Sequence, residues 1–339
     1  MSTLRIAIVG AGFMGLLHAR VVADSDRATV AAIIDPDVAG GRAAAEAFGV
    51  PHFADAGEAL AADAADAYIV AAPDRLHEDV TCALLAAGKP VLLEKPMAHT
   101  LTAAKAIARA AEKSGARLLV AHILRFDPRY AAAAKAVREG RIGTPIHASS
   151  GRLTNREVGQ RMNGRSSVCF YLGIHDVDML QWITGSNVRT VYSRTVSTLM
   201  PSLGVASEDA IFTTVEMENG MAGQLHSGWT LPESVPTGIW ARTEVIGTEG
   251  MIDLDVRDHG LRILSRGQWS LPDGLHWPET HGHITGDLYE EVRHFIGAVL
   301  DDRPFVMPVE DALRAVAVND AILASVASGQ RETVADWRI

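Results

Sequence analysis

The hydrophobic pattern differs between the two parts of the chain. Through residues 1–123, short apolar runs typical of strands buried on both faces alternate with helical patterns. The apolar runs cover 4–9, 29–34, 67–72, 91–93 and 117–122, and the helical patterns cover 16–23, 45–48, 76–87 and 102–114. Strands that alternate with helices form a parallel sheet with right-handed crossovers. We therefore predict an α/β domain with a doubly wound parallel sheet over residues 1–123.

Beyond this domain, several stretches alternate polar and apolar residues, as strands with one buried face do. A helix predicted from Pro128 to Glu139 leads into them. The candidate strands are Ile146–Leu153, Val188–Thr198, Ala210–Glu216, Ala222–Thr230, Arg242–Ile246, Met251–Asp255 and Leu261–Ser265. The pattern predicts an α+β domain over 124–339 with a large, mainly antiparallel open-faced sheet, whose C-terminal helices are placed to pack back on the first domain.

Composition and charge exclude several classes of protein. The 339 residues carry a net charge of −10 and no basic block, which argues against nucleic acid or an anionic membrane as partner. Cys82 and Cys169 are too few for a disulfide framework or a Cys-rich zinc site, and they fit a reducing compartment. The start, MSTLRIAIVG, lacks a secretory signal, and no run of 18 apolar residues occurs. We expect a cytoplasmic protein without a membrane span.

A glycine motif, GAGFMG, follows the first predicted strand. In the order strand, G-x-G-x-x-G, helix, Gly10 permits the tight turn and Gly12 lets the backbone approach a pyrophosphate. Gly15 lets helix and strand pack closely. The free N–H groups at the helix start then face the phosphates, beside Phe13 and Met14. The motif predicts a Rossmann dinucleotide-binding site.

Asp35 ends the second predicted strand, 20 residues beyond Gly15. A carboxylate there accepts from the ribose hydroxyls and would repel a 2′-phosphate. The nearest cation, Arg42, lies seven residues further on. We therefore favour NAD over NADP as the cofactor; the alternative interpretation of Asp35 is a turn residue at a strand end.

Further candidates follow the other predicted strands at their carboxyl ends, the edge at which open α/β sheets bind ligands. They are Pro73, the pair Glu94-Lys95 in VLLEKPMA, and His122. An isolated Glu-Lys-Pro is typical of a solvated turn. At this edge of the sheet, however, we predict that Lys95 lies in a cofactor cleft.

These segments together resemble the glucose–fructose oxidoreductase, inositol dehydrogenase and MocA (Gfo/Idh/MocA) family. The resemblance rests on the glycine motif, APDRLH, GKPVLLEKPMAHT and HILRFDPRY, and on GIHDVDMLQWITG with its G-x-H-x-x-D pattern. The stretch from Glu290 to Ser325 also resembles the family's ending, so the resemblance covers essentially the whole chain. It implies an NAD-dependent dehydrogenase acting on CH–OH groups of sugars, cyclic polyols or sugar derivatives.

The resemblance also implies roles for single residues. Lys95 is similar to the family's active-site lysine, and His175 to its proposed general base. Glu94 is similar to the acid at the nicotinamide-side ribose, and Pro96 to a proline that often follows a cis bond. The remaining positions are Pro73 and His77 in the cofactor cleft, with Arg125 and Asn155 at the substrate.

His175 is a candidate on its residue pattern as well. Leu172, His175, Met179 and Trp182 form a stripe at helical spacing. An imidazole can accept a hydroxyl proton near neutral pH. The alternative is a core histidine on an apolar face. Asp178 either orients the imidazole or charges the helix.

One position departs from the family's pattern. Many of its dehydrogenases have an aspartate four residues before the histidine, where this chain has Tyr171. Positions i and i+4 of a helix share a face, so we expect Tyr171 beside His175. Its phenol can donate to a substrate oxygen or to the imidazole, but it supplies no negative charge.

Weaker candidates complete the site. Arg152, Asn155 and Arg156 form a strand-end cluster that binds substrate hydroxyls or is a solvated edge, and Trp229 and Tyr289 are candidates for walls of the sugar site. The histidines of His281-Gly282-His283 lack an acidic or cysteine partner at ligand spacing. We therefore predict no metal site.

These residues give a mechanistic hypothesis. Lys95 hydrogen-bonds a substrate hydroxyl held between the domains, His175 takes the proton, and hydride passes to nicotinamide C4. The alternatives on the same fold are an NAD-dependent glycosidase using transient oxidation and a non-catalytic dinucleotide-sensing regulator. Because the second face of the large sheet needs covering, the resemblance also implies a homodimer or homotetramer through that sheet.

Overall fold

The computed structural model describes residues 3–257 and 259–339. They divide into two compact units. Unit 1 comprises the residues up to 126 together with 276–313 and 337–339, and unit 2 comprises 127–275 and 314–336. The division at Phe126 lies close to the predicted domain boundary. The segment 276–313, which the sequence assigns to the second domain, belongs to unit 1.

Unit 1 is built on a six-stranded sheet in the order β3-β2-β1-β4-β5-β6, and its strands are parallel. The strands are β1 (Leu4–Val9), β2 (Ala28–Ile34), β3 (His52–Phe53), β4 (Ala67–Val70), β5 (Val91–Glu94) and β6 (Leu118–Ala121). The strand order reverses direction between β1 and β4, and the crevice at such a point is where doubly wound sheets bind dinucleotides. The predicted doubly wound fold is confirmed.

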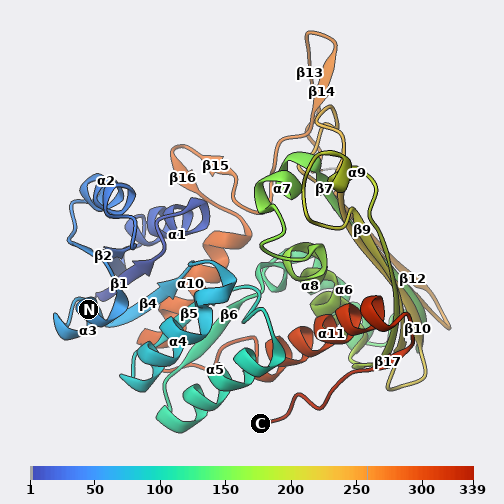
Figure 1. Ribbon diagram of the computed structural model, residues 1–339, viewed down its shortest axis with the longest axis horizontal. Coiled ribbons are helices and arrows are strands. Elements are labelled where there is room, and N and C mark those ends of the chain that lie inside the picture. The colour runs from blue at the N-terminus through green and yellow to red at the C-terminus, as the bar shows by residue number, and fades with distance from the viewer. Residues whose placement is uncertain (1–2, 258) are drawn as a thin grey trace. The chain divides into compact units, whose positions relative to one another are not determined.

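Helices cover this sheet. They are α1 (Phe13–Ala23), α2 (Val38–Phe48), α3 (Ala56–Ala61), η1 (Asp74–Leu76), α4 (His77–Ala86), α5 (Leu101–Ser114), η2 (Ile123–Arg125) and α10 (Asp287–Leu300). Helices α4 and α5 lie side by side, and α1 packs on α10 (Figure 1). Local capping sets several ends: the Asp37 side chain accepts from Ala39 N–H at the start of α2, and Gly49, with φ of 67°, ends that helix.

Unit 2 contains a seven-stranded sheet in the order β12-β11-β7-β10-β9-β8-β17, in which β7 and β10 are parallel and the other neighbours antiparallel. Its strands are β7 (Pro145–Asn155), β8 (Val188–Val196), β9 (Ala210–Met217), β10 (Ala222–Leu231), β11 (Ile239–Gly247), β12 (Met251–Asp255) and β17 (Glu332–Thr333). Its helices are α6 (Pro128–Arg138), α7 (Arg156–Met162), η3 (Cys169–Gly173), α8 (Ile174–Thr184) and α9 (Leu199–Ser202), and α11 (Val309–Ser328) begins in unit 1 and continues in unit 2.

One face of this sheet is buried under helices of the same unit. Along β11, Ala241, Thr243 and Val245 are buried, while Trp240 and Arg242, at the alternate positions, are exposed. Helix α8 packs on β7 and on α6. The mainly antiparallel, open-faced sheet is confirmed.

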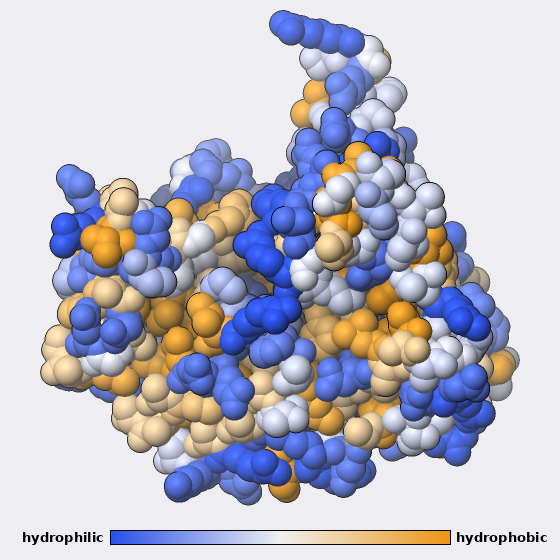
Figure 2. Space-filling view, viewed as in Figure 1, coloured by the Kyte–Doolittle hydropathy of each residue, from blue (hydrophilic) through white to orange (hydrophobic). Residues whose placement is uncertain are grey.

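The strand predicted at Leu261–Ser265 does not join this sheet. Ile263–Ser265 (β13) pairs instead with Gln268–Ser270 (β14) in a projecting hairpin (Figure 1). Arg266 and Gly267, at φ of 51° and 80°, form the two-residue turn that joins them. Local turn chemistry therefore outweighs the polar–apolar pattern here, and the prediction for this strand is wrong. The tip of the hairpin is hydrophilic (Figure 2).

Among the helices of the residues described, none is long and apolar enough to cross a membrane.

Candidate cofactor and active site

The glycine loop between β1 and α1 is crowded at two positions and open at the third. A Cβ at Gly10, whose φ is +96°, would lie 2.7 Å from the Ala71 carbonyl oxygen, and a Cβ at Gly15 would lie 1.8 Å from the Gly10 carbonyl oxygen. A Cβ at Gly12 would meet nothing within 4 Å. Gly12 therefore borders open space at the N-terminus of α1, where free N–H groups favour a phosphate. This geometry fits the pyrophosphate of a dinucleotide.

Asp35, at the end of β2, is tied to the glycine loop. Its Oδ2 accepts from Ala11 N–H at 2.7 Å, and its Oδ1 accepts from Asp37 N–H at 2.8 Å. Each carboxylate oxygen can accept a second hydrogen bond. The half-buried carboxylate thus braces the loop and keeps acceptor capacity for ribose hydroxyls.

Glu94, at the end of β5, is buried against α1. Its Oε1 lies 2.8 Å from Nε2 of His18, and its Oε2 accepts from Lys95 N–H at 3.1 Å. Burial alone would raise the pKa of Glu94, but the hydrogen bond and charge of His18, together with the charge of Lys95, hold that pKa below its ordinary value. Glu94 is therefore a carboxylate at neutral pH.

The Lys95–Pro96 bond is cis, as the resemblance implies, and His77 braces the turn that contains it. The ring nitrogens Nδ1 and Nε2 of His77 each lie 2.9 Å from a carbonyl oxygen, those of Pro96 and Ala72 respectively. The imidazole thus bridges the chain segments that follow β4 and β5. Lys95 itself is half-buried at the carboxyl edge of the sheet.

A second carboxyl group, Glu291 on α10, is completely buried in unit 1. Within the part of the chain that the structure describes, neither of its carboxyl oxygens has a hydrogen-bond partner. Burial, followed by the negative charges of Glu94 and Asp287, raises the pKa of Glu291 well above its ordinary value. Of these two buried carboxyl groups, Glu291 therefore keeps its proton more readily and Glu94 loses it more readily.

The segment 276–286 runs along α1. Trp277 packs edge-to-face on Phe13 of the glycine loop, with ring centroids 6.0 Å apart. Arg20 on α1 pairs with Glu279 at 2.7 Å, and Nδ1 of His283 lies 3.1 Å from Asp24. The predicted His281-Gly282-His283 motif is thus part of a small hairpin, β15 (Glu279–Thr280) and β16 (His283–Ile284), with its turn at His281 and Gly282.

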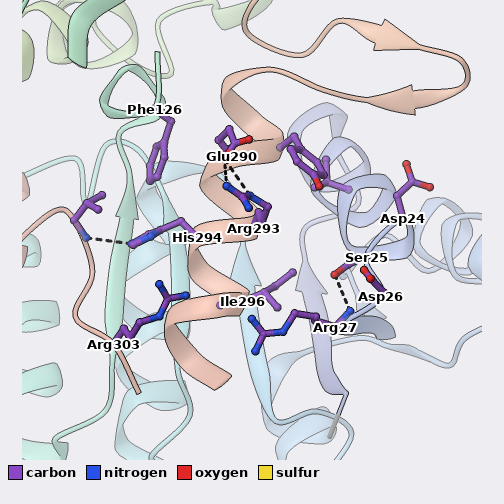
Figure 3. A pocket seen from close by; sticks show the side chains of 14 residues that line it. Asp24, Ser25, Asp26, Arg27, Phe126, Glu290, Arg293, His294, Ile296 and Arg303 are labelled. Atoms are coloured by element: carbon purple, nitrogen blue, oxygen red, sulfur yellow. Dashed lines mark hydrogen bonds and ion pairs between the residues drawn. The ribbon is translucent and has the colours of Figure 1, made fainter. Parts of the chain in front are cut away.

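A cavity of about 560 Å³ lies elsewhere in unit 1, along α10 and beside the C-terminal end of α1 (Figure 3). Tyr289, a predicted substrate wall, lines it. Its arginines are paired with acids: Arg27 and Arg303 with Asp301, and Arg293 with Glu290. Burial, followed by the charges of Arg303, Arg117 and Arg293, lowers the pKa of His294. The cavity is therefore balanced in charge, and it lies at the other end of α1 from the glycine loop.

In unit 2, His175 occupies the first turn of α8, directly after a π-helical turn, η3. Tyr171 lies in this π turn and His175 in the α-helical turn that follows it, so the two residues stand on successive turns of the same helical segment. Both side chains are half-buried. Burial raises the pKa of the Cys169 thiol in this turn to about 12, so it stays protonated and is a poor nucleophile.

Trp229 supports this turn from the sheet. It has no exposed surface, and its Nε1 donates to the Glu208 carbonyl oxygen at 2.5 Å. Its ring centroid lies 6.2 Å from that of Tyr171. Trp229 therefore backs Tyr171 and does not itself offer a surface.

The predicted arginines are engaged in ion pairs. Arg125 in unit 1 donates to Asp311 at 2.9 Å, and Arg152 in unit 2 donates to Asp176 at 3.0 Å. Asn155, at the start of α7, is half-buried and accepts from Thr154 Oγ1 at 3.1 Å. His122 is buried after β6, and Pro73 is exposed after β4.

The structure thus gathers the predicted residues into two groups. Unit 1 brings the glycine loop, Asp35 and the Glu94-Lys95 turn to one edge of its sheet. Unit 2 places Tyr171 and His175 on successive turns. Four further residues, which the sequence interpretation missed, contact these groups: His18, Asp176, Trp277 and Asn319. The buried Glu291, whose pKa the charge of Glu94 raises, was missed as well. His18 falls on the apolar stripe of α1 beside buried alanines and valines, which is a usable signal; the other four carry no local sequence signal.

Comparisons with known proteins identify the family of this chain. Residues 4–122 match the model "Oxidoreductase family, NAD-binding Rossmann fold", and residues 130–253 match the "GFO/IDH/MocA C-terminal domain" model. The inositol 2-dehydrogenase of Corynebacterium glutamicum strain R is 32% identical over 74% of this chain and 73% of that protein. The rhizopine catabolism protein MocA of Rhizobium meliloti is 25% identical over 95% of this chain and 94% of its own length.

A solved structure extends the likeness to the whole fold. GenD2 from gentamicin A biosynthesis, crystallised in complex with NAD, superposes with a TM-score of 0.87 at 26% identity, over 99% of this chain and 97% of GenD2. The two family models, the relative above 30% identity and the shared fold lead to one conclusion. This chain belongs to the Gfo/Idh/MocA oxidoreductase family, whose N-terminal domain is an NAD-binding Rossmann fold.

Proposed function

We propose that this protein is an NAD-dependent dehydrogenase that oxidises a secondary hydroxyl of a cyclic polyol, a sugar or a sugar derivative. One observation carries the proposal: the open Gly12 position, Asp35 and the Glu94-Lys95 turn lie at one edge of a parallel sheet. A hydride-transfer site needs a dinucleotide cradle and a proton-handling group at the same edge. The relatives named above support the substrate class, because one of them is an inositol 2-dehydrogenase.

Residues of unit 1 would hold the cofactor. The N–H groups at the start of α1 face the pyrophosphate, and Asp35 accepts from the adenosine ribose, which disfavours the 2′-phosphate of NADP. Glu94 accepts from the nicotinamide-side ribose. NAD, when bound, supplies the hydride acceptor at nicotinamide C4. Phe13 and Met14 border the loop, and His77 keeps the cis-Pro96 turn in place.

Lys95 and His175 handle the proton of the substrate. Lys95 donates a hydrogen bond to the reacting hydroxyl and stabilises the negative charge that grows on its oxygen. His175 accepts the hydroxyl proton, directly or through Lys95, while the carbon-bound hydrogen leaves as hydride. Lys95 lies in unit 1 and His175 in unit 2, so their joint action on one hydroxyl is the part of the proposal that mutation must test.

Substrate contacts come from the neighbours of these groups. Tyr171 and Asn155 are half-buried polar residues of unit 2, and we assign them to substrate hydroxyls. Arg125 and Arg152 have carboxylate partners and low exposure, 8% and 3%. We therefore assign Arg152 to holding His175 in place, and keep Arg125 as a proposed substrate contact.

The experiment is a screen for NADH formation over inositols, aldoses and sugar nucleotides, with NAD and NADP in parallel. We expect stoichiometric accumulation of NADH with at least one cyclic polyol or sugar. A glycosidase that uses transient oxidation would release product without net NADH. A dinucleotide sensor would bind NAD and oxidise no substrate. Either result would overturn the dehydrogenase proposal.

We also propose a homodimer or homotetramer through the open face of the unit 2 sheet. The side chains of Tyr192, Phe212 and Trp240, on strands of this sheet, are large and exposed, at 40%, 51% and 38%. Sedimentation of the unaltered protein and of Phe212→Glu tests the assembly: a monomer in both cases would overturn it.

We also propose a cytoplasmic location, which the two unbridged cysteines fit.

A further inference from the structure

The helix that carries His175 begins with an unusual turn. In η3, over Cys169–Gly173, the chain follows a π-helix before it continues as α8. A π turn bonds residues five apart instead of four, and such turns are frequent at functional sites. The turn disrupts the α-helical bonding pattern, so its polar backbone groups need other partners. Two contacts within unit 2 supply such partners, and an ion pair between side chains fixes the helix just beyond the turn.

Asn319 on α11 is the first. Its Nδ2 donates to the Cys169 carbonyl oxygen at 2.9 Å, and Asn319 is completely buried. Without this donor, the carbonyl would be left to bond the amide four residues on, at Gly173, as in an α-helix. That exchange would tighten the turn and rotate Tyr171 relative to His175.

Glu208 holds the start of the same segment. Its Oε1 accepts from Val168 N–H at 2.6 Å and from Ser167 Oγ at 2.7 Å. The backbone just before the π turn is therefore fixed by a carboxylate from the loop between α9 and β9.

An ion pair holds the other end. The Asp176 carboxylate, next to His175 in the chain, accepts hydrogen bonds from Arg152: Oδ2 from Nε at 3.0 Å and Oδ1 from Nη2 at 3.3 Å. Ser150 Oγ donates to the same carboxylate at 2.9 Å, and Arg152 also donates to the Tyr130 hydroxyl at 3.1 Å. Arg152 is 3% and Asp176 1% exposed. The α8 backbone beside His175 is thus tied to β7 by a bidentate pair.

A buried ion pair gives little net stability over a well-packed apolar pair of the same volume, because both charges lose their hydration. Its directional hydrogen bonds, in contrast, fix the geometry of the groups that they join. We propose that Asn319 and the Arg152–Asp176 pair are positioning residues that hold the π turn open and keep Tyr171 and His175 in register for proton transfer. This inference rests on the proposed function, in which His175 accepts the substrate proton.

The test compares two variants with one control. Asn319→Leu removes the donor to Cys169, and Arg152→Met combined with Asp176→Leu replaces the ion pair by an apolar pair. Gln330→Leu, an exposed amide just beyond α11, is the matched control. Should Asn319→Leu fail to fold, the apolar pair remains, because such replacements are commonly neutral or stabilising.

Two readouts are taken for each variant at unchanged NAD affinity. The rate of backbone hydrogen exchange over residues 168–176 should rise about tenfold or more. Residues that acted only through their charge, without holding the backbone, would leave this rate unchanged. The kcat for the alcohol that the unaltered protein oxidises should fall about 10–100-fold with a shifted pH midpoint, because a misplacement of about 1 Å costs rates of this order. Unchanged exchange in both variants, or raised exchange with unchanged kcat and pH midpoint, would overturn the inference.

The two proposals can fail separately. If the unaltered protein oxidises no alcohol, the proposed function fails, yet the exchange experiment still decides whether these residues hold the turn. Raised hydrogen exchange confined to residues 168–176 then supports the proposal that Asn319 and the Arg152–Asp176 pair hold the π turn, and unchanged exchange overturns it.

Discussion

Nε2 of His18 lies 2.8 Å from Oε1 of Glu94, and both side chains are buried between α1 and the end of β5. This contact joins the helix that begins at the glycine loop to the strand that delivers Lys95. It ties the position of the pyrophosphate cradle to that of the proposed active-site lysine within one unit.

Glu94→Gln should destabilise the protein at neutral pH by about 1.5–3 kcal/mol, the range for a hydrogen bond to a charged group. His18 and Lys95 lower the pKa of Glu94 below its ordinary value of 4.5. The stabilisation is therefore fully present at pH values above 4.5, and it is lost as the pH falls through the lowered pKa of the folded protein. Urea unfolding of both proteins at several pH values measures the difference. A gap that persists unchanged in strong acid would contradict the assignment; Glu46→Gln, exposed on α2, is the control.

Glu291→Gln should have the opposite pH dependence. Because the pKa of Glu291 is raised in the folded protein, the folded protein keeps this proton at pH values above 4.5, where the unfolded chain releases it. Relative to the unaltered protein, the variant should therefore gain about 1.4 kcal/mol for each pH unit above 4.5, until the pH passes the raised pKa. Unfolding free energies between pH values of about 5 and 8 provide the measurement. Equal stability of the two proteins across this range would contradict the raised pKa of Glu291; Glu290→Gln, its partly exposed neighbour, is the control for the substitution itself.

The glycines of the loop should respond differently to alanine. Gly12→Ala adds a Cβ in open space, so the variant should fold normally and lose NAD affinity by an order of magnitude or more. Gly15→Ala places a Cβ 1.8 Å from a backbone oxygen, so it should cost about 1–3 kcal/mol of stability or more. Thermal unfolding and NAD titration separate the two effects. Gly238→Ala, exposed and without neighbours within 4 Å, controls for the substitution itself. Normal NAD binding by a folded Gly12→Ala variant would contradict the proposal that this loop binds the pyrophosphate.

Asp35→Ala should weaken NAD binding about 10–100-fold, as expected for the loss of hydrogen bonds to a charged group, while NADP binding changes less. Titration of both dinucleotides against both proteins checks the ratio, with Glu46→Ala as the control of equal charge change. Tighter binding of NADP than of NAD by the unaltered protein would contradict the preference.

The elements of the cofactor site could be predicted because they follow from local rules. A strand, a glycine turn, a helix and a strand-end acid need only residues close in sequence, and the parallel sheet then brings Gly10, Asp35 and Lys95 to one edge. Turn chemistry was less visible: Arg266-Gly267 closes a hairpin that the alternation of polar and apolar residues assigned to the large sheet.

The rest of the site depends on contacts between distant segments. Arg152 resembles a substrate ligand in the sequence, because nothing near it reveals that Asp176 neutralises it in the core. The π turn at Cys169–Gly173 is stabilised by Asn319, 150 residues away, so a helical stripe through His175 cannot reveal it. Glu291 is likewise buried by packing of α10 on α1, which no local pattern encodes.

We propose that Lys95 and His175 act together on one hydroxyl. The most direct measurement is a double-mutant cycle on kcat for the oxidised alcohol, with Lys95→Ala, His175→Ala and the combined variant. Each single change should lower kcat about 10²–10⁴-fold at nearly unchanged NAD affinity, and the combined variant should lose no more than the worse single variant. Near-normal turnover in either single variant, or losses that multiply in the combined one, would contradict the account.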